Sequence, residues 1–390
     1  MASSLVSCNG GEYEMTQGQQ FFIQILSDFI HEKKSMIPDE LNMDELMRYG
    51  KLHEMMGIIY HQTGLPQFQT AFFYTMYTSK NRRRLLDELT AEFDFPWFLV
   101  KGTEVAELYP IPELRTMGDC DIVIHSQDRE VAHGIFLKQG FENKSKYPDR
   151  EWQYYKMNME FELHDHLIYT ENVNNPKQEI FFNNFWKYVS DNKLDWNFHF
   201  LYLVSHLRKH FMNEGVGFRP FVDLTIIINR VDLDWDWIEE YAEKTELRSF
   251  LRTVLAFCSR WFQIEVPIGI TELDEDFYEV STRRIFENGI FGYNNEDNGQ
   301  SDMINLYRKR GRLGAFDCVV KEIFIPYRLL SNVPKYSFVK GRPYLTSVAW
   351  IYRIFSERKN IGHKVLSLKK YFVSSEKIEK REDMYSRWGL

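Results

Sequence analysis

Two aspartates on either side of a cysteine are the residues of this chain best suited to chemistry. Asp119 and Asp121 lie two positions apart and precede the apolar run 122–124. Side chains alternate along a strand, so both carboxylates would project from one face while Cys120 turns toward the core. Neighbouring carboxylates are ligands for Mg²⁺, which keeps some waters and takes phosphate oxygens as its other ligands. The pair therefore predicts a metal site suited to in-line displacement at phosphorus.

A second acidic run offers a third ligand. Within residues 152–164, Glu160, Glu162 and His164 share one parity, whereas the apolar residues at 159, 161 and 163 share the other. We expect this run to form a strand beside the aspartates and to supply the third ligand, with Glu160 and Glu162 both on the ligand face. The alternative is a strand whose exposed face merely carries acids. Like charges this close destabilise the fold unless a cation neutralises them, which favours metal binding.

The turn upstream of the aspartates is a candidate phosphate site. Residues 95–100 are apolar and predict a short strand, which runs into Lys101-Gly102-Thr103. Glycine lets the backbone approach a phosphate closely, and a helix that follows would offer free N–H groups. Lys101 and Arg115 are the nearest cations that can neutralise a triphosphate. Either can instead pair with a glutamate, at 104 or 113, and the sequence leaves both readings open.

Several short motifs make the chain resemble a known family. They are KG at 101–102, LYP at 108–110, the arginine at 115, GDCDIVI at 118–124 and FELH at 161–164. In this order they look like the uncharacterised nucleotidyltransferase family of the DNA polymerase beta superfamily. The superfamily signature is a hydrophobic-Gly-Gly/Ser turn, then Asp-x-Asp/Glu, then a carboxylate on a later strand. This chain departs from it at Lys101 and Thr103, and in a longer gap before Asp119.

The resemblance implies an activity and a set of site residues. The activity is transfer of a nucleoside monophosphate from ATP or another nucleoside triphosphate to an acceptor hydroxyl, with pyrophosphate leaving and Mg²⁺ or Mn²⁺ as cofactor. The implied metal ligands and catalytic residues are Asp119, Asp121 and Glu162, and the implied nucleotide-binding residues are Lys101, Gly102, Thr103 and Arg115. The acceptor stays open between a small molecule, a protein and a tRNA.

Two other functions compete with this one. The altered turn and the long gap favour a non-catalytic nucleotide-binding or interaction protein that keeps the fold. A transferase that uses another activated nucleotide donor is the second alternative, because the same metal site would serve it. Release of pyrophosphate from a nucleoside triphosphate would discriminate among the three.

The pattern of hydrophobic residues predicts an α+β protein in three parts. Residues 1–93 and 176–390 have mainly helical periodicity, whereas residues 94–175 alternate between strand and helix patterns. We expect a small mixed β-sheet nucleotidyltransferase core, as the resemblance implies, flanked by mainly helical N- and C-terminal parts.

Composition indicates an ordinary globular chain. The 390 residues are 44% hydrophobic and 27% charged with a formal net charge of -8, so the surface as a whole is not built to attract nucleic acid. The four cysteines have neither close pairing nor metal spacing. No apolar run approaches the length of a membrane span, so we expect a cytoplasmic protein without a membrane partner.

Three further groups have both a structural and a functional interpretation. His206 and His210 lie four apart on a predicted helix, which suits zinc, but without a third ligand we favour packing or a hydrogen bond to the catalytic loop. Arg219 and Asp223 have the spacing of an ion pair on one helix face, although Arg219 would also suit a phosphate. The arginine triplet 82–84 is expected to be a solvated helix face rather than an RNA patch.

Overall fold

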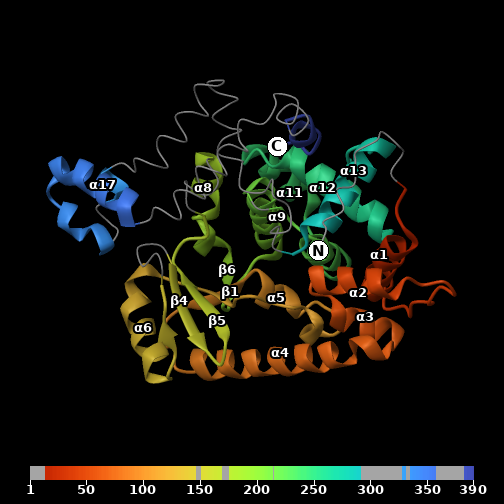
Figure 1. Cartoon of the computed structure of the whole chain (residues 1–390), viewed down its shortest axis with the longest axis horizontal. Coiled ribbons are helices and arrows are strands. Elements are labelled where there is room, and N and C mark those ends of the chain that lie inside the picture. Colours follow the sequence, from red (N-terminus) through yellow and green to blue (C-terminus); the bar gives the residue numbers. More distant parts are fainter. Residues whose placement is uncertain are drawn as a thin grey trace. The chain divides into compact units, whose positions relative to one another are not determined.

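The two acidic runs lie on neighbouring strands of one five-stranded mixed sheet (Figure 1). The strands, in chain order, are β1 (Trp97–Val100), β2 (Asp121–Ile124), β3 (Glu142–Asn143), β4 (Glu151–Lys156) and β5 (Met159–His164). The sheet order is β1-β2-β5-β4-β3, in which only the central β2–β5 pairing is parallel. The predicted α+β class with a small mixed sheet is therefore confirmed.

The computed structural model describes residues 14–145, 151–168, 175–213, 215–290, 327–330, 334–356 and 382–390. The chain divides into two compact units, one of residues 1–296 with 388–390 and the other of residues 297–387. All three parts expected from the sequence thus contribute to the first unit. Within the described residues no helix is both long and apolar enough to cross a membrane.

One face of the sheet is apolar because of the strand alternation. The residues of one parity on β2 and β5, among them Ile122, Phe161 and Leu163, are buried in a cluster with the helices α4 (Gln69–Thr90) and α6 (Arg129–Lys138). Leu85, Leu86 and Leu89 provide the contacts of α4 with this cluster. The residues of the opposite parity on β2 and β5, which include the acids, project from the other face of the sheet.

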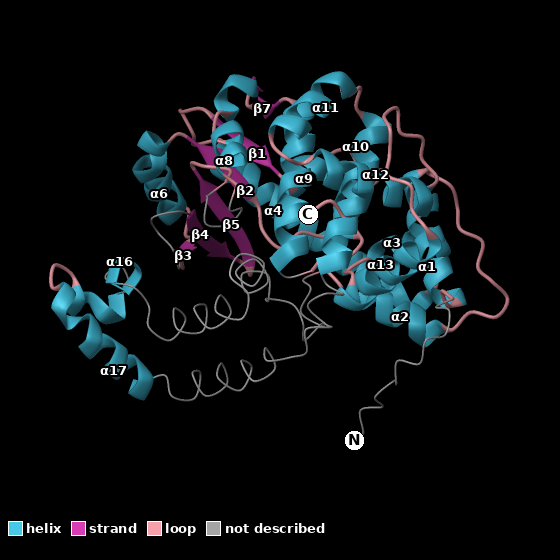
Figure 2. Cartoon of the chain, turned by 90° about the horizontal axis from the view of Figure 1, so that it is seen from above, coloured by secondary structure: helices cyan, strands magenta, loops and turns pink. Residues whose placement is uncertain are grey.

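Helix α9 (Trp196–Asn213) approaches this second face, and Figure 2 shows the strands between α6 and α9. The remaining elements around the sheet are α5 (Gly102–Ala106), the 3₁₀ turns η2 (Pro112–Leu114), η3 (Ser126–Asp128) and η4 (Phe185–Tyr188), α8 (Pro176–Phe182), and the hairpin of β6 (Val189–Ser190) and β7 (Lys193–Leu194). A hydrogen bond from the Lys101 amide to His199 joins the end of β1 to α9. The sheet is thus enclosed by helices on both faces.

Helices from before and after the sheet pack together in the first unit. The N-terminal ones are α1 (Gln17–Ile30), α2 (Met43–Leu52) and α3 (Met56–Thr63), followed by η1 (Pro66–Phe68). The later ones are α10 (Arg219–Arg230), α11 (Trp235–Lys244), α12 (Arg248–Phe262) and α13 (Glu275–Asn288). Helix α1 contacts both α10 and α12, and Thr16 and Gln19 form a capping box at its start. Helical regions distant in sequence therefore share one core.

In the second unit the described elements are α16 (Tyr327–Leu330), η5 (Pro334–Val339), η6 (Pro343–Leu345), α17 (Thr346–Ser356) and a helix over residues 382–387. Leu330, Tyr336, Val339 and Ala349 form a small apolar cluster there.

Candidate active site

Asp121 and Glu162 are direct neighbours on the two parallel strands. Their Cα atoms are register partners, so both side chains project from the same face of the sheet. His164, two residues after Glu162, lies between the carboxylates, with Nε2 2.9 Å from Oδ1 of Asp121 and 3.3 Å from Oε2 of Glu162. One ligand atom from each of the three lies within 4.8 Å of the other two. The structure thus brings two predicted ligands together and adds a histidine.

Lys101 reaches the same cluster from the end of β1. Antiparallel pairing places Val100 opposite Asp121, so the next residue begins beside the aspartate. The Lys101 ammonium lies 2.5 Å from Oδ1 of Asp121, and its side chain is 18% exposed. Lys101 has φ 55° and ψ -129°, a combination that glycine adopts readily and other residues seldom adopt. A residue with a strained backbone therefore places its ammonium beside the Asp121 carboxylate.

The protonation of the cluster follows from these contacts. Burial would raise the pKa of Asp121, but Lys101 and His164 hold it well below its usual range. Burial would lower the pKa of His164, yet hydrogen bonds to Asp121 and Glu162 raise it to about 9. Burial also opposes ionisation of Glu162, whose pKa is nevertheless lowered by its bond to His164. Two ionised carboxylates therefore face one imidazolium and one ammonium.

Asp119 lies just before β2, outside the tight group of Asp121, Glu162 and His164. The Asp121 carboxylate raises its pKa, and burial adds to the effect, so the two aspartates lie within electrostatic reach of one another. The backbone here is held by Arg82, whose guanidinium donates to the carbonyls of Asp119 and Met117 at 2.9 and 3.0 Å. Arg82 is thus a buried support of the acidic loop rather than part of a solvated face.

Arg115 is engaged in a buried ion pair with Asp223. Its Nε and one terminal nitrogen donate to the two oxygens of Asp223 at 2.9 and 2.7 Å, and the Tyr109 hydroxyl donates to Asp223 at 2.6 Å. Both charged side chains are 8% exposed. Burial would lower the pKa of Arg115, but Asp223 raises it. This arrangement gives Arg115 a structural partner 108 residues away.

The residues of the Gly102-Thr103 turn are packed against their neighbours. A Cβ atom at Gly102 would collide with the Arg115 guanidinium, so the glycine makes room for the buried ion pair. The Thr103 hydroxyl is buried and lies 3.4 Å from the Cys120 sulfur. Both residues begin α5, directly after Lys101.

The other acid of β5 is held apart from the cluster. Glu160 accepts a hydrogen bond from the Tyr155 hydroxyl at 2.6 Å, whereas Glu162 accepts one from the Gln153 amide at 2.9 Å. Residues of one parity on β4 thus support both acids, and only Glu162 lies beside Asp121.

Helix α9 turns a polar stripe toward this face of the sheet. His199 accepts the Lys101 amide, and burial raises the pKa of Tyr202 to about 12, with Lys101, Asp121 and Glu162 among its electrostatic neighbours. His206 and His210 follow on the same side, with their Nε2 atoms 3.0 Å apart. The two rings are therefore hydrogen-bonded to each other, a contact that the sequence reasoning did not foresee.

Arg219 does not pair with Asp223, contrary to the spacing argument. It donates to the Thr116 carbonyl at 3.0 Å and lies 3.7 Å from a carboxylate oxygen of Glu54. Asp223 is already engaged by Arg115, so the expected intrahelical pair was wrong.

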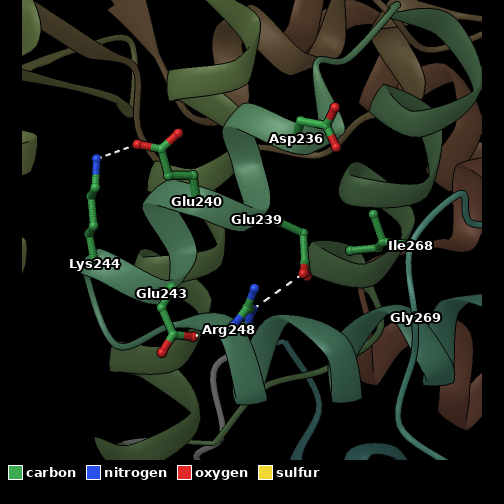
Figure 3. A pocket seen from close by; sticks show the side chains of 8 residues that line it. All are labelled: Asp236, Glu239, Glu240, Glu243, Lys244, Arg248, Ile268 and Gly269. Carbon is green, nitrogen blue, oxygen red and sulfur yellow. Dashed lines mark hydrogen bonds and ion pairs between the residues drawn. The ribbon is translucent and has the colours of Figure 1, made fainter.

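A surface depression on α11 and α12 lies apart from these residues. Its volume is about 610 Å³, and it is lined mainly by charged side chains of the two helices. Figure 3 shows two of its acids facing cations: Glu239 binds Arg248, and Glu240 binds Lys244. Arg252 also binds Glu239, so the charge of this depression is largely neutralised within the protein.

Comparison with known proteins decides the family. The model of a family described as an uncharacterised nucleotidyltransferase matches residues 40–263, more than half of the chain and all the residues of the acidic cluster. The chain belongs to the uncharacterised nucleotidyltransferase family. No curated protein and no solved structure matches it.

The possible metal ligands of this nucleotidyltransferase family member fit a divalent cation, which nucleotidyl transfer employs. Asp121 and Glu162 offer hard oxygen atoms from adjacent strands, and His164 adds an imidazole nitrogen. The two carboxylates suit Mg²⁺ and Mn²⁺, whereas an imidazole is a more usual ligand of metals such as iron and zinc. A cation at this point would take over the neutralising role that His164 and Lys101 have in the metal-free protein.

Sequence reasoning gave no role in the site to two polar residues of this family member. His164 shares the parity of Glu162, and that signal was sufficient to place it on the acidic face. His199 lies on a helix with no motif of its own, 98 residues from its partner Lys101. No spacing rule points to such a contact.

Proposed function

We propose that the protein transfers a nucleoside monophosphate from a nucleoside triphosphate to an acceptor hydroxyl, with release of pyrophosphate. The observation that carries this proposal is the direct pairing of Asp121 with Glu162 on parallel strands, within a chain of the nucleotidyltransferase family. Asp121 and Glu162 would hold Mg²⁺ or Mn²⁺, with Asp119 and His164 beside them. The cation supplies charge stabilisation to the phosphates.

The chain's own residues would divide the remaining tasks. Lys101 would exchange its contact with Asp121 for one with the triphosphate, and Gly102 and Thr103 would line the same end of the nucleotide. Asp119 has a raised pKa, which suits it better than the other two acids to take a proton. It would accept the acceptor hydroxyl proton as the acceptor oxygen bonds to the α-phosphorus. The bond from that phosphorus to the bridging oxygen breaks, and pyrophosphate keeps the electron pair.

The decisive experiment is pyrophosphate release in the presence of Mg²⁺ or Mn²⁺. Each of the four nucleoside triphosphates is tested with fractionated small molecules, protein and tRNA as acceptors. The expected result is release that requires both the cation and one acceptor class, and that is lost in Glu162→Gln but retained in Glu160→Gln. Release that is equal in both variants would contradict the assignment.

A non-catalytic nucleotide-binding role is the second candidate. It is favoured by one observation, the occupation of a single Asp121 oxygen by both Lys101 and His164 in the metal-free protein. Nucleotide binding without pyrophosphate release, under all the conditions above, would support it. Cleavage of another activated nucleotide would instead indicate a different donor.

A further inference from the structure

His199 joins α9 to the strained residue at the end of β1. The amide N–H of Lys101 donates to Nε2 of His199 at 2.9 Å. A backbone amide can only donate, so Nε2 carries the lone pair and the ring proton of the neutral form lies on Nδ1. Burial, followed by the charge of Arg115, lowers the pKa of His199 to about 3, which keeps the ring an acceptor at physiological pH.

The His199 ring is held in a fixed place and makes one hydrogen bond. It is fully buried and stacks on Trp196, with ring centroids 5.1 Å apart and planes at 20°. Among the described residues its Nδ1 has no hydrogen-bond partner. A buried donor without a partner costs free energy, so the bond that Nε2 accepts is the favourable polar contact of this ring.

That bond acts on a residue whose backbone is unfavourable and whose side chain reaches the acids. Lys101 has φ 55°, and its ammonium lies 2.5 Å from Asp121. Strained conformations persist only where the surroundings over-determine them. His199 holds the backbone of Lys101 through its amide, and Asp121 holds the side chain of Lys101 through its ammonium.

We propose that His199 is a positioning residue for Lys101: it holds the Lys101 amide and thereby directs the ammonium to the acidic cluster and to the nucleotide phosphates. The part that concerns the phosphates rests on the proposed transfer reaction. The part that concerns the amide is independent of any reaction.

Two matched variants test whether the side chain at residue 199 must reach the Lys101 amide or need only be polar. In His199→Gln the side-chain oxygen can take the place of Nε2, whereas in His199→Asn the same amide group is one bond too short. Hydrogen exchange at the Lys101 amide, read by fragmentation mass spectrometry of the metal-free protein, should become about tenfold faster or more in His199→Asn. Exchange in His199→Gln should stay close to that of the wild type, as should exchange along β4 in both variants.

Transfer kinetics test whether His199 acts through Lys101. His199→Asn should lower kcat/KM for the nucleotide by about tenfold to a hundredfold, with His199→Gln rescuing most of it. In the Lys101→Ala background, His199→Asn should have less than about a twofold further effect, because the residue that it positions has no ammonium. A purely structural role would instead give independent, multiplicative losses.

The outcomes separate the two proposals. Unchanged Lys101 exchange in a folded His199→Asn protein, or multiplicative losses in the double variant, would overturn the positioning role while leaving the transfer reaction standing. A wild-type protein that transfers nothing, but shows the expected exchange pattern, would refute the proposed function and support the amide contact. If His199→Asn fails to fold, His199→Leu is used, because it also lacks an acceptor.

Discussion

The ammonium of Lys101 and the imidazole of His164 bind the same oxygen of Asp121, at 2.5 and 2.9 Å. One carboxylate oxygen therefore has two cationic partners before any metal or nucleotide arrives. A divalent cation that binds this same oxygen would displace at least one of them, and a displaced lysine is then free to meet a phosphate. The following predictions derive from this arrangement.

The two aspartates should differ in their effect on stability. Asp121→Ala leaves Lys101 and His164 buried beside a missing partner, so the free energy of unfolding should fall by about 3 kcal/mol. Asp119 is destabilised by its neighbour, as its raised pKa indicates, so Asp119→Ala should be neutral or stabilising. Urea denaturation of both metal-free variants measures the difference. Equal losses would contradict the assigned neutralisation of Asp121.

Glu162 and Glu160 provide a matched test of the metal site on one strand. Glu162→Gln should weaken Mn²⁺ binding by about tenfold to a hundredfold, because it removes the charge of one of the two carboxylate ligands. Glu160→Gln should change the affinity by less than about threefold, because Glu160 is bound to Tyr155 and not to the cluster. Isothermal titration calorimetry with Mn²⁺ gives both values. A larger loss of Mn²⁺ affinity in Glu160→Gln than in Glu162→Gln would indicate that the metal binds at Glu160 instead.

Stability should depend on pH through His164. Its pKa in the folded protein, about 9, is above the ordinary value of 6.5, so the charged ring stabilises the fold. This contribution is complete below pH 6.5 and is lost as the pH rises through about 9. The free energy of unfolding of the metal-free protein should therefore fall by about 3 kcal/mol over this window. His164→Gln should remove most of the slope, and an unchanged slope would exclude the assignment.

Arg115 should act on stability rather than on phosphate binding. Arg115→Met leaves Asp223 buried with only the Tyr109 hydroxyl, so unfolding should become easier by about 3 kcal/mol. The combination with Asp223→Asn should be less destabilising than the sum of the single changes, by about 1–3 kcal/mol. Mn²⁺ affinity of the folded variant should stay within about threefold of the wild type. Loss of nucleotide binding without loss of stability would restore Arg115 to the phosphate site.

The outcome of the sequence reasoning separates local from long-range information. The alternation of acids and apolar residues on β5 is a local pattern that put Glu162 and His164 on one face, and the family resemblance placed Glu162 beside Asp121, as their register confirms. The partner of Arg115 could not be inferred in this way, because the Arg115–Asp223 contact depends on how α10 packs against the loop after α5. The same holds for His199 and Lys101. Helix spacing even suggested a wrong partner for Asp223.

Trp388 has a consequence for how the chain is connected. The side chain is fully buried in the first unit, stacked on Phe257 with centroids 4.5 Å apart, and its Nε1 donates to Ser281 at 3.1 Å. Ile290, near the other boundary, donates its amide to the Leu52 carbonyl. Ile290 and Trp388, the described residues nearest the two boundaries, are therefore both held by contacts within the first unit. A single proteolytic cut within residues 297–387 should leave two fragments that co-elute, because the C-terminal fragment keeps the contacts of Trp388.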